Sequence, residues 1–211
     1  MNASHLTAIM LQPINDAVDL ESAAQSSNVM IVGPAAGVTP ATRANVETIL
    51  KSKARAVLDA DALTVFEGSQ SALFKRLRPD DIVTPHAGEF HRLFGYAQDD
   101  GINKIETARR AAKEAGCVVL LKGADTVIAA PDGRAIVNTH ATPWLATAGS
   151  GDVLAGLIAG LMAQGMPTLE AAAMAAWVHG EAGRRVGAGL ISEDLQRHVP
   201  DILSALHGEI A

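Results

Sequence analysis

Small residues and one acid form the strongest chemical signal in the sequence. Gly149, Ser150 and Gly151 come directly before Asp152, and an apolar, helix-forming run follows at once. Glycines let a backbone approach a ligand closely, and the free N–H groups at a helix start attract anions. An acid in the first turn could instead serve the helix dipole alone. Because two glycines precede the acid, the pattern favours an anion cradle over a simple helix cap.

A second set of polar residues follows a short apolar run, in the segment Thr84-Pro-His-Ala-Gly-Glu89. In open parallel sheets, ligands bind beyond the carboxyl ends of the strands. His86 could therefore hydrogen-bond a substrate, and Glu89 could hold a phosphate-linked Mg²⁺ or its water. The alternative is structural: Pro85 and Gly88 turn the chain, and Glu89 lies in the first turn of the next helix.

Three further segments of small and charged residues end apolar runs. Lys122-Gly-Ala-Asp-Thr126 suits a phosphate or nucleotide, but it also fits an ordinary hairpin. Gly33-Pro-Ala-Ala-Gly37 could admit a ligand or merely turn the chain. Asp59-Ala-Asp61 is either a cation site or a strand stop followed by a helix cap. The residues alone leave both interpretations open in each segment.

Other residues of reactive type are expected to serve packing. Cys117 lies beside an apolar run, and nothing near it in the sequence would lower the pKa of its thiol. His179 has no second ligand four residues further along its helical run, so we expect no metal site there. The fingerprints Gly-x-Gly-x-x-Gly and Gly-x-x-x-x-Gly-Lys-Ser/Thr are both absent from the sequence.

Hydrophobic periodicity predicts the elements that must position these residues. The expected strands are Val29–Val32, Ala56–Leu58, Ile82–Val83, Val118–Leu121, Thr126–Ala129 and Ala135–Val137. The expected helices are 39–50, 103–115, 151–164, 168–186 and 192–206. This alternation predicts an α/β fold with a mostly parallel sheet, an antiparallel hairpin near one edge and helices on both faces.

Length and composition exclude several classes of protein. With 211 residues and no long linker, we expect one domain covering residues 1–211. The net charge of −6 argues against a nucleic-acid partner, which requires clustered Lys and Arg. The longest apolar run, Val153 to Ala163, is too short to cross a bilayer, and no secretory signal is visible. A lone cysteine excludes an internal disulfide. We therefore expect no membrane partner and a cytoplasmic location.

Taken in order, four segments resemble those of one family. They are Leu58-Asp-Ala-Asp-Ala-Leu63, Thr84-Pro-His-Ala-Gly-Glu89, Leu121-Lys-Gly-Ala-Asp-Thr126 and Ala146-Thr-Ala-Gly-Ser-Gly-Asp152-Val-Leu-Ala-Gly156. The family is that of the ADP/ATP-dependent NAD(P)H-hydrate dehydratases, which belong to the ribokinase-like superfamily. It includes the C-terminal domain of the bifunctional nicotinamide-nucleotide repair enzyme. The resemblance covers roughly residues 8–203 and implies a ribokinase-like three-layer α/β fold.

The resemblance also implies a repair reaction. Hydrated NADH or NADPH is dehydrated to the working cofactor at the expense of ADP or ATP, with Mg²⁺ as cofactor and with AMP or ADP and phosphate as by-products. It assigns Asp152 as the base, Gly37 and His86 together with Asp152 to the hydrated dinucleotide, and Glu89 to Mg²⁺. It assigns the adenine nucleotide to Lys122, Gly123, Ala124, Asp125, Thr126 and Gly151. It further implies a homotetramer, with an NAD(P)H-hydrate epimerase as a linked activity.

The sequence departs from the family in three places. The family usually carries a further glycine where Ala148 stands, and it reads Gly-Pro-Gly-Leu-Gly where this sequence has Gly33-Pro-Ala-Ala-Gly37. The family domain also opens with a strand, a Gly/Ser-rich loop and a helix that have no counterpart here, so we expect a fold without them. Two alternatives remain open. One is a ribokinase-like kinase of a vitamin precursor, although such kinases more often carry Asn in place of His86; the other is a non-catalytic relic of the dehydratase.

Overall fold

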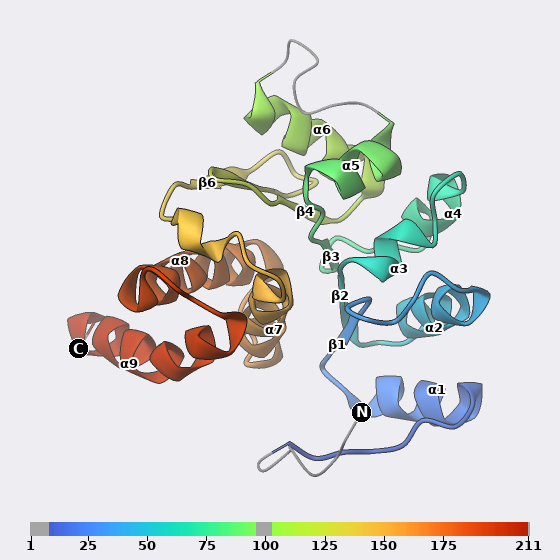
Figure 1. The fold of residues 1–211 in the computed structure, drawn as a ribbon. Coiled ribbons are helices and arrows are strands. Elements are labelled where there is room, and N and C mark those ends of the chain that lie inside the picture. Colours follow the sequence, from blue (N-terminus) through green and yellow to red (C-terminus); the bar gives the residue numbers. More distant parts are fainter. Residues whose placement is uncertain (1–8, 96–102, 211) are drawn as a thin grey trace.

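A six-stranded sheet lies at the centre of the described molecule (Figure 1). The computed structural model describes residues 9–95 and 103–210. The strands are β1 (Val29–Val32), β2 (Arg55–Leu58), β3 (Ile82–Val83), β4 (Val118–Leu121), β5 (Thr126–Ala129) and β6 (Ala135–Asn138). They lie side by side in the order of the chain; β1 to β4 are parallel, and β5 is antiparallel to both β4 and β6. The expected mostly parallel sheet with an antiparallel hairpin at one edge is confirmed.

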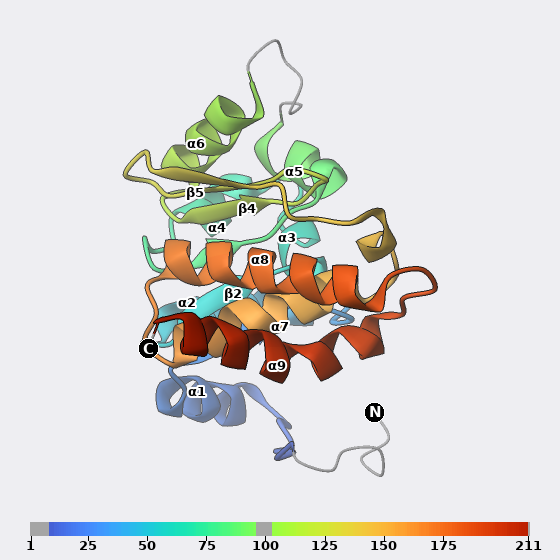
Figure 2. The ribbon, with the colours of Figure 1, turned by 90° about the vertical axis from the view of Figure 1, so that its left-hand side faces the viewer.

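Helices cover both faces of the sheet and complete a three-layer fold. They are α1 (Ala17–Ser26), α2 (Pro40–Lys51), α3 (Asp61–Thr64), α4 (Gln70–Phe74), α5 (Ala87–Phe94), α6 (Lys104–Ala115), α7 (Ser150–Ala163), α8 (Thr168–Val186) and α9 (Ser192–Ile210), with a short 3-10 helix, η2 (Pro143–Leu145). Figure 1 shows α7 and α8 on one face of the sheet and α2 to α6 on the other. Figure 2 shows α9 packed along the outside of α7 and α8. The five helices expected from the sequence are present, and α1, α3, α4 and α5 add to them.

Alternate residues of the inner strands fill two separate cores. In β2, Leu58 packs toward the layer of α2 to α6, while Val57 packs toward α7 and α8. In β4, Leu121 and Leu120 divide between the two cores in the same way, and all four side chains are fully buried. Successive side chains of a strand point to opposite faces, so a strand covered on both faces carries an unbroken apolar run. That is why these strands could be located from the sequence.

β1 lies at the edge of the sheet, so this expected strand is only partly buried. It pairs with β2 on one side, and within the described residues no strand pairs with its other side. Ile31 is accordingly 40% exposed. In the turn that follows, Ala36 donates to the carbonyl of Gly33 and Ala35 has φ +54°, a value that glycine adopts freely and alanine does not. The departure from the family's Gly-Pro-Gly pattern thus leaves a strained alanine at this turn.

The C-terminal helices pack closely through small residues. Ala155 of α7 and Ala171, Ala172 and Ala175 of α8 are almost completely buried between the helices and the sheet. Small side chains let helix axes approach one another, which explains the alanine-rich composition of this region. Among the helices of the described ranges, none combines the length and the apolar character that crossing a membrane requires.

Candidate functional site

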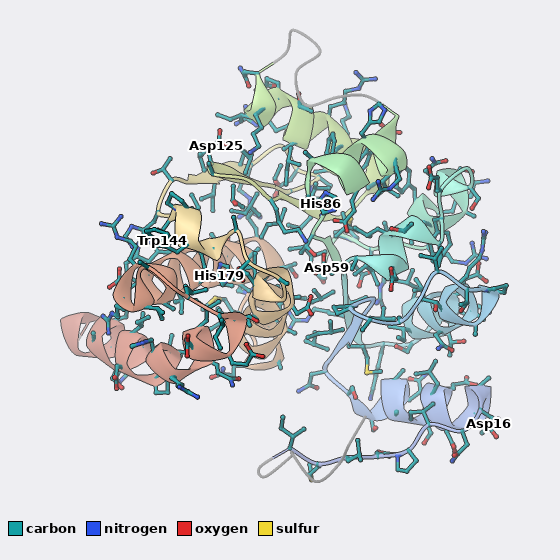
Figure 3. The ribbon with its side chains drawn as sticks, viewed as in Figure 1. Asp16, Asp59, His86, Asp125, Trp144 and His179 are labelled. Carbon is teal, nitrogen blue, oxygen red and sulfur yellow. The ribbon has the colours of Figure 1, made fainter. Side chains whose placement is uncertain are left out.

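Three loops at the carboxyl ends of β2, β3 and β4 bring charged residues together. Asp59 follows β2, Glu89 follows β3 in the first turn of α5, and Lys122 follows β4. The ammonium of Lys122 donates to Asp59 Oδ1 at 2.8 Å and lies 3.9 Å from Glu89 Oε2. Asp59 and Glu89 are 1% and 7% exposed. Segments far apart in the sequence therefore meet in one partly buried cluster, around which Figure 3 labels Asp59 and His86.

His86 and Glu89 form a capping box at the start of α5. The backbone N–H groups of Gly88 and Glu89 point at His86 Nδ1, which accepts from both, and Glu89 Oε2 accepts from the backbone N–H of His86 at 2.9 Å. Glu89 therefore lies in the first turn of a helix, as the structural alternative expected, whereas Gly88 lies within that helix and not in a turn. The ring of His86 remains half exposed, and its Nε2 lies 3.4 Å from Glu89 Oε1. Its contact with a substrate stays a prediction.

The start of α7 presents free backbone N–H groups. Gly149 takes the helix N-cap position with φ +80°, and no side chain caps this helix. The first N–H groups of a helix lack acceptors within the helix, so this end suits an anion. Asp152 lies exposed in the same first turn, whereas Ser150 is buried.

A cavity of about 560 Å³ opens at the edge of the sheet where β4 and β6 end and β5 begins, between the start of α7 and the middle of α8. Five segments line it, and they contribute apolar and polar side chains in equal number. The lining residues are Lys122, Gly123, Ala124, Thr126, Asn138, Ala141, Thr142, Pro143, Leu145, Ala146, Thr147, Ser150, Gly151, Leu154, Ala176 and His179. An apolar pocket with a few convergent polar groups is the usual form of a small-molecule site.

Some residues predicted to bind ligand line this cavity and others do not. Lys122, Gly123, Ala124, Thr126 and Gly151 are all part of its wall, together with Ser150 from the expected anion cradle.

Asp125 lies outside that wall and pairs with Lys104 at 2.8 Å, and this hydrogen bond lowers the pKa of the Asp125 carboxyl. Gly37 lies in a different loop, where its N–H donates to Asp61 Oδ2. The structure therefore separates the expected dinucleotide contact at Gly37 from the lining of the cavity.

Asn138, His179 and the segment 141–147 line the cavity, although sequence reasoning did not place them there. His179 Nε2 lies 3.0 Å from both Oγ and O of Ser150, and its burial lowers the pKa of the imidazole to about 4. It is therefore neutral at pH 7. The signal available in the sequence was a histidine followed by glycine within an alanine-rich helix.

The segment 140–145, which forms the outer wall of the cavity, packs closely against α8. A Cβ built on Gly180 would lie 1.8 Å from the carbonyl oxygen of His140, and one on Gly183 would lie 2.8 Å from Leu145. The ring of His140 also stacks on Trp177 and bonds to Glu181 Oε2 at 2.9 Å. Glycines on this face of α8 thus allow the segment before η2 to lie against the helix.

The donor set near Lys122 fits a phosphate-bound Mg²⁺ but not a protein-enclosed metal. Among residues 9–95 and 103–208, no three His, Cys, Asp or Glu side chains gather in a geometry for a metal ion. Glu89 offers one buried carboxylate 3.9 Å from the ammonium of Lys122. Mg²⁺ is commonly held by one or two carboxylates together with phosphate oxygens and water, so this set is sufficient when a nucleotide is bound.

Comparisons of the sequence with known proteins point to one family. The profile of a family described as NAD(P)H-hydrate dehydratase matches residues 1–203. A bifunctional NAD(P)H-hydrate repair enzyme of Salinibacter ruber is 39% identical over 198 residues, which cover 90% of this chain and 36% of that enzyme. The chain thus spans little more than a third of the length of this curated relative.

Comparisons of the fold agree. An ADP/ATP-dependent NAD(P)H-hydrate dehydratase from Bacillus subtilis, co-crystallized with ATP/Mg²⁺ and soaked with CoA, aligns with a TM-score of 0.72 at 28% identity, over 89% of this chain and 71% of that one. A ribokinase-like superfamily protein from Enterococcus faecalis aligns with a TM-score of 0.77 at 25% identity, over 89% and 66% of the two chains. The expected ribokinase-like fold is confirmed.

Proposed function

The chain belongs to the NAD(P)H-hydrate dehydratase family, and we propose that it dehydrates hydrated NADH or NADPH at the expense of ADP or ATP. The observation that carries this proposal is the cavity beside the start of α7, whose wall includes Lys122 and Gly151. A nucleotide in that cavity would direct its phosphates at the free N–H groups of the helix. The family match favours this reaction over a vitamin-precursor kinase of the same fold.

Asp152 is the proposed base. It lies exposed in the first turn of α7, next to the cavity residues Ser150 and Gly151. It would take the proton of the substrate hydroxyl as that oxygen attacks the terminal phosphoryl group of the nucleotide, which leaves AMP or ADP. The phosphorylated hydrate then eliminates phosphate together with a proton, and the dihydronicotinamide ring is restored. Phosphate leaves far more readily than hydroxide, which is why the nucleotide is needed.

The other predicted residues take roles around this step. Lys122 and Gly151 would hold the phosphates, and Gly123, Ala124 and Thr126 would line the nucleoside part of the cavity. Asp125 and His86 have exposed side chains, and Gly37 lies in a separate loop. Their contacts with the substrates would therefore lie at the mouth of the site and not within the cavity.

The finer assignments complete the proposal. Glu89 is the residue that would hold Mg²⁺, which when bound supplies positive charge to the phosphate oxygens. Residues 1–211 would act as one domain within a cytoplasmic homotetramer. A linked NAD(P)H-hydrate epimerase is proposed because the curated relatives are named as bifunctional repair enzymes and are much longer than this chain.

The test is a recovery assay. The protein is incubated with hydrated NADH, Mg²⁺ and either ADP or ATP, and the return of NADH absorbance is followed with time. We expect recovery with at least one nucleotide, release of phosphate in equal amount, and none without nucleotide. Absence of recovery with both nucleotides and with both hydrated NADH and hydrated NADPH, from a sample shown to be folded, would refute the proposal.

A further inference from the structure

We propose that Asp59 is a positioning residue that holds the ammonium of Lys122 at the start of α7, where it meets the phosphoryl group that the nucleotide transfers. The proposal rests on the proposed function and gives a role to a residue so far without one. The primary observation is the hydrogen bond of 2.8 Å from Lys122 Nζ to Asp59 Oδ1. It joins residues 63 positions apart, at the ends of β2 and β4.

The burial of the two side chains is unequal. The side chain of Asp59 is 2% exposed, and that of Lys122 is 21% exposed and forms part of the cavity wall. A buried carboxylate without a partner is costly, so Asp59 strongly favours conformations in which the lysine stays paired with it. Lysine has a long, flexible side chain, and a fixed partner removes much of that freedom. Asp59 thereby determines where the positive charge lies.

The ammonium is held against the start of α7. A Cβ built on Gly151 would lie 3.5 Å from Lys122 Nζ and 3.9 Å from Asp59 Oδ2. Gly151 belongs to the first turn of α7, whose N–H groups lack intrahelical acceptors. The lysine charge and the helix end therefore act on the same small region. An anion there would be stabilised by both, as the transferred phosphoryl group requires.

Glu89 offers the same ammonium a second carboxylate. Its Oε2 lies 3.9 Å from Lys122 Nζ and already accepts from the backbone N–H of His86. Without Asp59, the lysine would move toward Glu89 and away from its place beside α7. The shorter bond to Asp59 therefore separates the two charges, with Lys122 beside Gly151 and Glu89 left for the proposed Mg²⁺.

The backbone of Asp59 is fixed on both sides. Its N–H donates to the carbonyl of Val32, and its own carbonyl accepts from Ala62 N–H. Gly33 packs so closely on that carbonyl that a Cβ there would lie 1.6 Å from the oxygen. The next residue, Ala60, has φ +50°, a conformation that strains residues other than glycine. Strain of this kind persists where the surroundings over-determine the conformation, so the backbone that carries the Asp59 carboxylate is firmly held.

A role in folding alone does not account for the pair. Buried ion pairs are weak stabilisers, and apolar residues of similar volume often serve as well. An ion pair whose lysine borders a ligand cavity is better explained by what that lysine binds.

The experiment is a double-mutant cycle. Wild type, Asp59→Asn, Lys122→Met and the double variant are compared by kcat, by KM for hydrated NADH, and by ADP affinity from titration calorimetry. Asp132→Asn is the matched control, because its carboxylate pairs with Arg134 on an exposed turn. We expect Asp59→Asn to lower kcat by roughly 10- to 100-fold, with KM for hydrated NADH changed by less than about twofold. In the Lys122→Met background the same substitution should cause no further loss.

The cycle distinguishes failure of this inference from failure of the proposed function. Wild-type kcat and ADP affinity in Asp59→Asn, or equal losses in both backgrounds, would overturn the role of Asp59. If the wild type binds ADP but shows no turnover, the dehydratase proposal fails. The coupling between Asp59 and Lys122 is then measured from the ADP affinities of the four proteins. If the folded wild type binds no ADP, both proposals fall. Should Asp59→Asn not fold, Asp59→Glu keeps the charge but moves it by one methylene, and we expect the same fall in kcat.

Discussion

Ser150 and His179 join α7 to α8 through a buried contact, with the hydroxyl of Ser150 3.0 Å from Nε2 of the imidazole. The same nitrogen lies 3.0 Å from the carbonyl oxygen of Ser150. Ser150 begins α7, so this contact fixes the helix end that would face the phosphates. The position of the helix start thus depends on a neutral histidine 29 residues further along the chain.

The stability of the protein should fall in mild acid because of His179. Burial lowers the pKa of this imidazole from 6.5 to about 4, so the unfolded chain takes up the proton first. The contribution of His179 to the free energy of unfolding is complete above pH 6.5 and is lost as the pH falls toward about 4. At pH 5 the loss is about 2 kcal/mol, from 1.36 kcal/mol per pKa unit. Urea unfolding at pH 7.5 and pH 5 measures it, with His179→Gln as the reference. An equally steep loss in the variant would contradict this assignment.

Replacement of Asp152 by asparagine should remove the reaction but keep the nucleotide. The amide cannot accept the hydroxyl proton, so we expect kcat to fall roughly 10²- to 10⁴-fold. ADP affinity should change little, since the cavity wall contains Ser150 and Gly151 but not Asp152. Turnover and calorimetric titration of the same sample separate the two effects. Wild-type turnover in Asp152→Asn would exclude it as the base.

A methyl group at Gly33 should prevent normal folding. Its Cβ would lie 1.6 Å from the carbonyl oxygen of Asp59, and the φ of +129° disfavours any other residue. We expect Gly33→Ala to lower the free energy of unfolding by more than about 4 kcal/mol. Gly160→Ala is the control, because nothing lies within 4 Å of its Cβ position in α7. That change should stabilise the protein by about 0.5–1 kcal/mol. Similar unfolding curves for the two variants would contradict the close packing at Gly33.

Removal of Arg78 should destabilise the protein strongly. Its guanidinium bonds both oxygens of Asp81, which is completely buried, and also reaches the carbonyls of Ser52 and Ala54. Arg78→Met leaves that carboxylate without its charge partner, at a cost of about 3–5 kcal/mol.

The matched control is Arg134→Met, which breaks exposed ion pairs with Asp132 and Glu170 and should leave the free energy of unfolding nearly unchanged. Chemical unfolding of both variants provides the comparison. A loss below about 1 kcal/mol in Arg78→Met would show that Asp81 finds another partner.

The order and type of the longer elements could be predicted from local patterns. β4 carries four consecutive apolar residues because both of its faces are buried, and α8 keeps helical periodicity over 19 residues. α3 and α4 are four and five residues long, too short for periodicity to separate them from turns. The exposure of β1 was also hidden, since an edge strand and a central strand can carry the same run Val-Met-Ile-Val.

The site was predictable where one loop contains it and not where distant segments meet. Lys122 and Gly151, which line the cavity, could be singled out from the sequence because glycine, lysine and helix-start signals are local. The partners of these residues are not: Asp59 is 63 residues from Lys122, and nothing in the sequence links His179 to Ser150. Asp125 shows the opposite case: it belongs to a segment predicted to bind nucleotide, but its side chain pairs with Lys104 and lies outside the cavity wall.

The strand order of the sheet has a consequence for synthesis on the ribosome. Each strand pairs with the one before it, so the sheet can grow as the chain emerges. The apolar face formed by Val57, Ile82 and Leu120 is nevertheless covered only when α7 and α8 have been made. Arg55 likewise bonds to the carbonyls of Met162 in α7 and Met166 in the turn before α8, 107 and 111 residues later. Nascent chains that end soon after β6 would expose this apolar face, which makes that interval the stage most prone to aggregation and most dependent on chaperones.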